Sequence, residues 1–213
     1  MSADTPEARM LCELATLTCP LLALGQAAEA ADAWVKDGDA KGQLLGRWRT
    51  EVGALGRILV LRGFEAPEDL TSERRRALLS ANPFNAGSVV TALEMDSYAP
   101  FPFLPPIRTG RRGGLYEFRT YRLKPGGLTR TLAGWEPAIA PARDLTEHLV
   151  VNMYALDGAP RITHIWGFES LEERGRLRAQ AYASGHWPPK GGPEQIAEAT
   201  SSLALPEPGS PLA

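Results

Sequence analysis

Three side chains that could do chemistry alternate along the segment Leu115 to Leu123. Residues two apart point to the same face of an extended strand, so Glu117, Arg119 and Tyr121 share one face of this segment. A carboxylate beside a guanidinium can hold it and a polar ligand, and tyrosine adds a hydroxyl group. The alternative is an internal ion pair that fixes the register of two packed sheets and binds no ligand.

A second pair of candidates lies on the segment Arg161 to Phe168, where His164 and Trp166 share one face. Because free imidazole titrates near a pH of about 6.5, His164 is a candidate general acid or base. Trp166 is a candidate wall of an apolar pocket. The alternative is a core histidine that is satisfied by a hydrogen bond beside ordinary core aromatics. A single histidine with no partner at ligand spacing is a poor metal site.

The chain carries one sequence pattern twice, 104 positions apart. Three blocks keep this offset: 11–16 with 115–120, 57–65 with 161–169, and Arg74 with Arg178. A shared offset indicates duplication of a unit of about 100 residues.

The two copies differ at the candidate positions. The residues of the first copy that align with the five candidates are Glu13, Ala15, Leu17, Val60 and Arg62. Only Glu13 keeps the type of its counterpart, so a site would be single and built mainly from the second copy. Arg62 could add a charge across the interface between the copies. Loss from one copy is equally compatible with a scaffold that binds nothing.

The order of elements in each copy is strand, helix, strand, turn, strand, helix, strand. In the second copy the patterns predict strands at 115–123, 148–156, 161–168 and 196–205. One helix is predicted from the apolar stripe of 128–139, and another after Ser170, which forms a capping box with Glu173. In the first copy, strands are predicted at 44–52, 57–64 and 89–98, with a helical stripe over 24–35 and a second helix starting at Pro67.

This order defines an α+β fold of two tandem ferredoxin-like βαββαβ units, each an antiparallel sheet with two helices on one face. The open face of each sheet must be buried, and packing the two faces together gives a pseudo-dimeric α/β barrel within one chain. The predicted organisation is a flexible extension (1–9), a first domain (10–107), a linker (108–114) and a second domain (115–213). We expect the more apolar set of Tyr116, Phe118 and Thr120 to lie under the helices, and Glu117 and its companions to face the barrel interior.

Two blocks of the second copy, 115–126 and 162–174, resemble the NIPSNAP family, and the resemblance covers most of 114–205. The first copy resembles the family more weakly, through Gly63, Phe64 and Glu65. The resemblance implies the dimeric α/β-barrel superfamily, in which most NIPSNAP-like domains pair as separate chains. Related barrels include small monooxygenases, haem-degrading enzymes, and binding and structural proteins. It therefore implies a fold and no single reaction.

Composition excludes several classes of function. The formal net charge is -2, which gives no electrostatic case for nucleic acid or an anionic membrane surface, and no stretch has the ~20 apolar residues of a membrane span. Cys12 and Cys19 have no counterparts in the second copy, which indicates a reduced, cytoplasmic protein without a disulfide framework. The sequence contains no zinc signature, phosphate loop or dinucleotide fingerprint, so no cofactor is expected.

Three functions are compatible with these features. The leading hypothesis is a barrel that binds a small, partly apolar molecule between its two sheets. The second is a cofactor-independent monooxygenase or isomerase, with His164 or Glu117 as base and Arg119 stabilising an enolate-like anion. The third is a non-catalytic interaction module, for which the aromatic segment 98–103 would supply an exposed patch or a homodimer contact. The segment 186–189 is a candidate lid over the barrel mouth.

Overall fold

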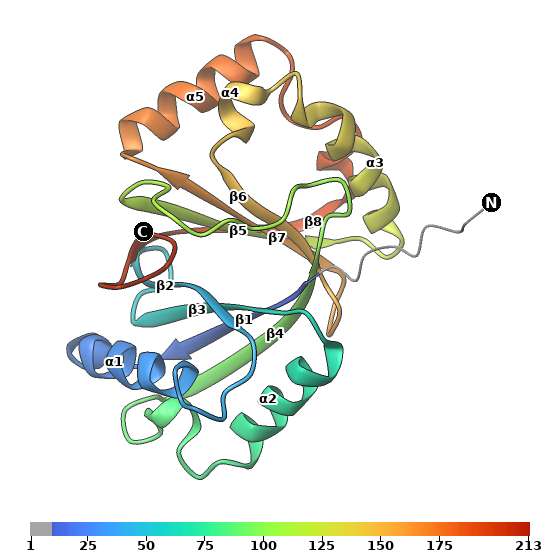
Figure 1. Ribbon diagram of the computed structural model, residues 1–213. Helices are drawn as coiled ribbons and strands as arrows, with labels where there is room; N and C mark the ends of the chain where they lie inside the picture. The colour runs from blue at the N-terminus through green and yellow to red at the C-terminus, as the bar shows by residue number, and fades with distance from the viewer. Residues whose placement is uncertain (1–9) are drawn as a thin grey trace.

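Eight antiparallel strands close into a barrel in the computed structural model, which describes residues 10–213 (Figure 1). The expected extension 1–9 lies outside the described residues. The strands are β1 (Leu11–Thr18), β2 (Gln43–Val52), β3 (Arg57–Phe64), β4 (Ala92–Pro100), β5 (Leu115–Leu123), β6 (Leu149–Ala155), β7 (Arg161–Phe168) and β8 (Ile196–Pro206). Their order around the barrel is β1-β3-β2-β8-β5-β7-β6-β4.

The barrel consists of two ferredoxin-like units. The sheet order is β4-β1-β3-β2 in the first unit and β8-β5-β7-β6 in the second. In each unit the order is therefore fourth strand, first, third, second. The two sheets join at β2–β8, where Trp48 pairs with Pro206, and at β4–β6, where Tyr98 pairs with Ala155. The predicted α+β pseudo-dimeric barrel within one chain is therefore confirmed.

The helices cover the outer faces of the two sheets, at opposite ends of the view in Figure 1. Those of the first unit are α1 (Leu24–Val35) and α2 (Pro67–Leu79), and those of the second are α3 (Gly127–Ile139), α4 (Arg143–Thr146) and α5 (Leu171–Ala183). Three short 3-10 helices are η1 (Leu21–Ala23), η2 (Pro83–Asn85) and η3 (Pro193–Gln195). No helix within residues 10–213 is long and apolar enough to cross a membrane.

The cap of α5 shows how local sequence sets the start of a helix. The Ser170 hydroxyl accepts a hydrogen bond from the backbone N–H of Glu173 at 3.1 Å. The Glu173 carboxylate in turn accepts one from the N–H of Glu169, the residue before the cap, at 2.8 Å. The first bond satisfies an N–H group that the first turn of a helix leaves without a partner, and the two bonds together fix where α5 leaves β7.

Aromatic side chains from both units fill the space between the two sheets. The Trp48 ring of β2 lies 5.2 Å from that of Tyr116 and 5.1 Å from that of Phe118, both on β5. Met153 of β6 and Ile165 of β7 complete this buried cluster. Buried aromatic and aliphatic side chains thus pack together in the space where a ligand was expected, and the cavity described below lies outside it.

The assignment of strand faces in β5 is the reverse of the expected one. Tyr116 and Phe118 face the barrel interior, while Glu117, Arg119 and Tyr121 face the helices of their own unit. The interior is closed by two sheets, so it takes the most apolar face of each strand. The face under the helices reaches solvent at its rim, where polar side chains can pair with helix residues.

The aromatic segment 98–103 is buried instead of forming an exposed patch. Tyr98 is 1% exposed and belongs to the barrel core, and Phe101 packs against Trp135 of α3 with ring centroids 5.9 Å apart. The Phe101 N–H donates to the carbonyl of Asn152 on β6 at 2.8 Å. The segment therefore ties β4 to the second unit, and its aromatic rings Tyr98 and Phe101 are buried within this chain.

Candidate functional site

A cavity of about 240 Å³ lies between the second sheet and its helices. Strands β5, β7 and β8, helices α3 and α5, and the loop after α5 all contribute to its wall. The polar and aromatic residues that line it are Arg119, Tyr121, Trp135, His164, Arg178 and Tyr182. Among the lining residues, all within the described part of the chain, none is acidic.

The structure divides the six residues predicted from the sequence into three groups. Arg119, Tyr121 and His164 line the cavity together. Trp166 and Glu117 lie behind the cavity wall, where each bonds to other residues of the second unit. Arg62 is in the first unit and takes no part.

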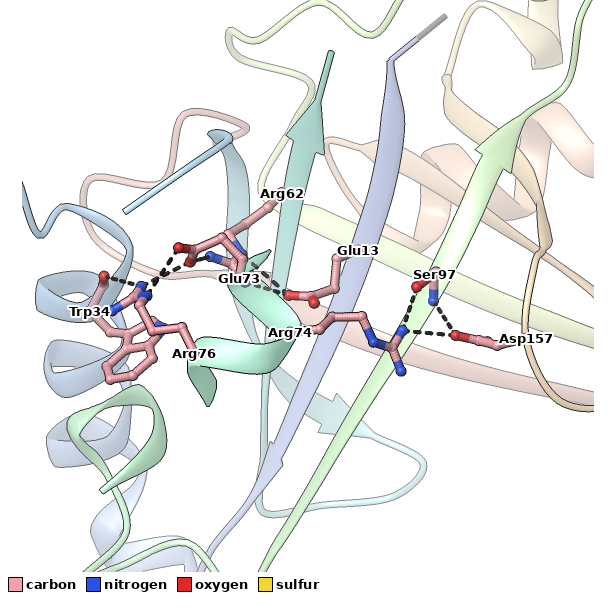
Figure 2. A network of polar contacts seen from close by, with 8 residues as sticks. All are labelled: Glu13, Trp34, Arg62, Glu73, Arg74, Arg76, Ser97 and Asp157. Carbon is pink, nitrogen blue, oxygen red and sulfur yellow. Dashed lines mark hydrogen bonds and ion pairs between the residues drawn. The ribbon is translucent and has the colours of Figure 1, made fainter. Parts of the chain in front are cut away.

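Arg62 has its partners within its own unit. It donates to Glu13 at 2.7 Å and to Glu73 of α2 at 2.5 Å, and Figure 2 shows all three side chains on the helix side of the first sheet. Its side chain is 1% exposed. The expectation that Arg62 adds a charge across the interface between units is therefore wrong, because two carboxylates hold it on the opposite face of the sheet.

His164 is a hydrogen-bond donor at the cavity. The indole Nε1–H of Trp166 donates to His164 Nδ1 at 2.6 Å. An indole nitrogen can only donate, so Nδ1 accepts and the ring proton resides on Nε2. Burial, followed by the charges of Arg119 and Arg178, lowers the His164 pKa well below its ordinary value, so the ring is neutral. His164 Nε2 has no hydrogen-bond partner among the described residues.

Glu117 is an ionised group of the supporting structure. It is fully buried and accepts hydrogen bonds from Arg174 of α5 at 2.6 and 2.9 Å and from the Ser201 hydroxyl at 2.8 Å. Burial acts to raise the pKa of Glu117, but these hydrogen bonds and the charge of Arg119 outweigh it and lower the pKa. Arg119 Nη1 lies 3.6 Å from Glu117, and Arg119 Nε has no partner among the described residues.

Two cationic side chains meet at the cavity. Arg178 of α5 lines it opposite Arg119, and burial and the charge of Arg119 lower the Arg178 pKa. Arg178 donates to the Tyr182 hydroxyl at 3.4 Å. Burial raises the pKa of Tyr121, so this phenol keeps its proton. The polar part of the cavity is therefore dominated by donors and by positive charge.

Sequence reasoning missed Arg178 and Tyr182 as site residues. Arg178 appears in the sequence only as a marker of the repeat, matched to Arg74. The signal that could have found it is helical spacing: Leu177 and Ala181 are the buried residues of α5, and Arg178 and Tyr182 follow them by one position along the rim of that face.

The segment 186–189 covers this cavity and not the mouth of the barrel. Trp187 is 6% exposed and packs edge-on against Trp135 at 5.0 Å and Trp166 at 5.8 Å. The N–H of Trp187 donates to the carbonyl of Ala181 on α5 at 3.2 Å. With Pro188 and Pro189 it forms an apolar roof that is anchored to the helix.

Comparisons with known proteins agree with this architecture. Residues 116–211 match the NIPSNAP family model. The chain is 25% identical over 171 residues to Protein NipSnap homolog of Dictyostelium discoideum, covering 78% of this chain and 73% of that protein. It is 26% identical over 153 residues to Protein NipSnap of Drosophila melanogaster, covering 68% of this chain and 55% of that protein. The chain thus spans only about half of the Drosophila relative.

A solved structure resembles the whole chain in fold. The anthrone oxidase-like protein superposes with a TM-score of 0.65 over 97% of this chain and 94% of its own, at 14% sequence identity. That likeness concerns the arrangement of two ferredoxin-like units in one barrel. The second unit of this chain is thus similar to the NIPSNAP family, as the match over 116–211 and the two NipSnap relatives show.

Proposed function

We propose that the cavity of the second unit binds a small, partly apolar molecule. The observation that carries this proposal is a partly open cavity of about 240 Å³, whose walls combine apolar rings with buried donors that have no partner among the described residues. Ligand pockets usually measure about 300–1,000 Å³, and an apolar cavity of about 150 Å³ can hold benzene. The space therefore suits a molecule built on one or two rings.

The lining supports a ligand with two unlike ends. Trp135, Trp187 and Ile162 offer apolar and aromatic surface for a flat body. Arg119 and His164 offer donors that have no hydrogen-bond partner within residues 10–213. A ligand that fills the apolar part and accepts at the polar part would satisfy both regions.

Calorimetric titration with two ring compounds of equal shape, 1-naphthoate and 1-naphthamide, tests this proposal. We expect at least one to bind, and Ile196→Trp to abolish the binding because the larger side chain fills the cavity from β8. Leu22→Trp, at a fully exposed position of the first unit, serves as the control and should leave binding unchanged. Absence of binding by both compounds to the unaltered protein would overturn the proposal.

Catalysis is a second candidate function, favoured by the positive cavity. Two arginines and a neutral N–H donor could stabilise an enolate- or phenolate-like anion, as a cofactor-independent oxygenase or isomerase requires. The name of the protein with the similar fold, an anthrone oxidase-like protein, points to the same class of reaction. The base roles considered for His164 and Glu117 lack support, since His164 Nδ1 is occupied by Trp166 and Glu117 is held in its ion pair.

Oxygen uptake with anthrone as probe tests the catalytic candidate. The reaction consumes one O₂ for each anthrone converted to anthraquinone and one water, so oxygen uptake and quinone absorbance must rise together. Arg119→Gln should lower the rate, because the charge that faces the anion is lost. A rate no higher than that without protein would remove the catalytic candidate and leave the binding proposal as it stands.

A further inference from the structure

The charges around the cavity do not balance. Arg119, Arg174 and Arg178 bring three positive charges to this side of the second sheet, and Glu117 is the carboxylate that pairs with them. Glu117 is engaged mainly by Arg174, through two hydrogen bonds, and lies farther from Arg119. Arg178 forms no ion pair with an acid in the described part of the chain. The cavity therefore carries uncompensated positive charge.

Two buried donors in the same place lack acceptors. Arg119 Nε and His164 Nε2 are both buried and have no hydrogen-bond partner among the described residues. His164 is 2% exposed and lines the cavity, and the Trp166 indole occupies its other ring nitrogen. A buried donor without an acceptor is costly, so such groups are normally satisfied by something that binds there.

The first unit shows what a satisfied arginine looks like at the same position of the repeat. Arg74, which aligns with Arg178, forms an ion pair with Asp157 at 2.8 Å and also bonds to Ser97 (Figure 2). Asp157 lies in the turn between β6 and β7 of the other unit. In the turn between β2 and β3 the aligned residue is Gly53, beside Ser201 and Ser202. The acid that compensates Arg74 thus has no counterpart for Arg178.

Resting on the proposed function, we infer that the ligand is a small organic anion, whose charged group is held by Arg119, Arg178 and the Nε2–H of His164. Its apolar body lies against the rings of Trp135 and Trp187, which line the apolar part of the cavity. A carboxylate suits this arrangement because guanidinium groups bind carboxylates through paired N–H donors, and the histidine adds a third donor from the sheet. Binding would relieve the repulsion between the two arginines and satisfy both buried donors.

The experiment extends the titration above to a matched set of three probes: 1-naphthoate, 1-naphthamide and 1-naphthylmethylammonium, at pH 7 and low salt. We expect 1-naphthoate to bind at least tenfold more tightly than the amide, and the ammonium compound to bind most weakly. Equal affinities for the anion and the amide would overturn this inference while the proposed binding function stands. No binding of any probe would overturn both.

A pair of variants on α5 locates the charge effect. Arg178→Gln should weaken 1-naphthoate at least tenfold and change the amide by less than twofold. Arg176→Gln removes the same charge from an exposed position of the same helix and should leave both affinities unchanged. An equal loss of affinity for 1-naphthoate in the two variants would show a general effect of surface charge. It would contradict the proposed binding of the anion by Arg178.

A spectroscopic readout on the unaltered protein guards against a variant that fails to fold. We expect 1-naphthoate to shift the nuclear magnetic resonance signal of the His164 Nε2–H strongly, and the ammonium compound to leave it unchanged. A signal that does not move when 1-naphthoate saturates the protein would exclude His164 from the anion site.

Discussion

The two units pair a buried glutamate with a cation in different ways, on the face of each sheet that the helices cover. Each first strand carries a buried glutamate, Glu13 or Glu117. In the first unit the compensating cation is Arg62, which stands opposite Glu13 on β3. In the second unit Trp166 stands opposite Glu117, and the cation is Arg174 from α5.

The position of the cation, on a strand in one unit and on a helix in the other, goes with a difference in the other side chains of the strands. In the first unit, where the cation Arg62 lies on the strand, Ala15 and Val60 pack with Phe84 and Trp34 into an apolar cluster on the outer face of the sheet. Arg76 completes that side by stacking 3.7 Å from the Trp34 ring and bonding to Glu73.

With Arg174 on the helix, the second sheet is free to carry other groups. Trp166 fixes His164, and Arg119 stands beside that histidine in the strand register. The first unit thus pairs Glu13 with Arg62 inside its own structure, whereas the second leaves Arg119 Nε and His164 Nε2 without hydrogen-bond partners among the described residues, on side chains that line a cavity. The lesson is that two similar units can keep the same buried acid and still differ in the polar side chains that surround it.

The largest effect on stability is expected in the first unit, where Arg62 is buried. Arg62→Leu leaves the buried Glu13 without the cation that pairs with it and leaves Glu73 with Arg76 alone, and breaking a buried ion pair typically costs about 3–5 kcal/mol. Urea denaturation should show this loss in the free energy of unfolding. Arg111→Leu, at an exposed ion pair with Glu169, is the control and should leave stability unchanged. A loss as small as that of the control would mean that the first unit does not depend on its internal network.

A smaller effect is expected where the second unit holds its histidine. Trp166→Phe removes the donor to His164 Nδ1, and leaving a buried acceptor unpaired costs about 1–3 kcal/mol. The variant should also raise the His164 pKa, because the lost hydrogen bond favoured the neutral ring. Urea denaturation and a nuclear magnetic resonance titration measure the two effects. An unchanged pKa would show that Trp166 acts on His164 only as a packing partner.

The smallest effect expected is a dependence of stability on pH that originates in the second unit. The folded state holds His164 neutral, with its pKa well below the ordinary value, while the unfolded chain binds a proton near pH 6.5. The unfolded state therefore binds more protons below about pH 6.5, so stability falls as the pH is lowered, by at most about 1.4 kcal/mol per pH unit. Carboxylates with lowered pKa, such as Glu117, act in the same direction at more acidic pH.

Matched histidine variants isolate that contribution. His164→Asn keeps an oxygen near Nδ1 for the Trp166 donor and removes the titrating ring, so the decline between pH 7.5 and 5.5 should flatten. His186→Asn, at an exposed position, should leave the slope as it is. Equal slopes in the unaltered protein and both variants would indicate that the pKa of His164 is the same in the folded and the unfolded state.

Local sequence patterns determined most of the elements. The strands at 115–123 and 161–168, the helix that follows Ser170, and the helix that begins at Pro67 are confirmed at the predicted residues. Alternation, capping and proline placement act within a few residues, so the elements they set can be predicted from the sequence alone. The last strand of the first unit is shifted to 92–100, because Val89 and Val90 bond back to Ala86 in a turn and the far end of β4 pairs with β6.

Alternation also grouped the site residues correctly, placing Glu117, Arg119 and Tyr121 on one face of β5. What alternation cannot supply is the direction of that face, because a strand in this barrel is buried on both sides, by the other sheet and by its own helices. The choice depends on which side demands the more apolar set, and that follows from the packing of Trp48 from a distant strand against Tyr116 and Phe118.

The sequence by itself therefore determined the repeat, the element order, the α+β barrel class and the resemblance to NIPSNAP proteins, since each depends on local pattern or on matching residues. Only the tertiary structure decided that the cavity lies under the helices, that Arg178 joins Arg119 and His164, and that Arg62 stays with Glu13 and Glu73. Those outcomes depend on side chains far apart in the chain competing for the same buried space and charge, and no local pattern records the result of that competition.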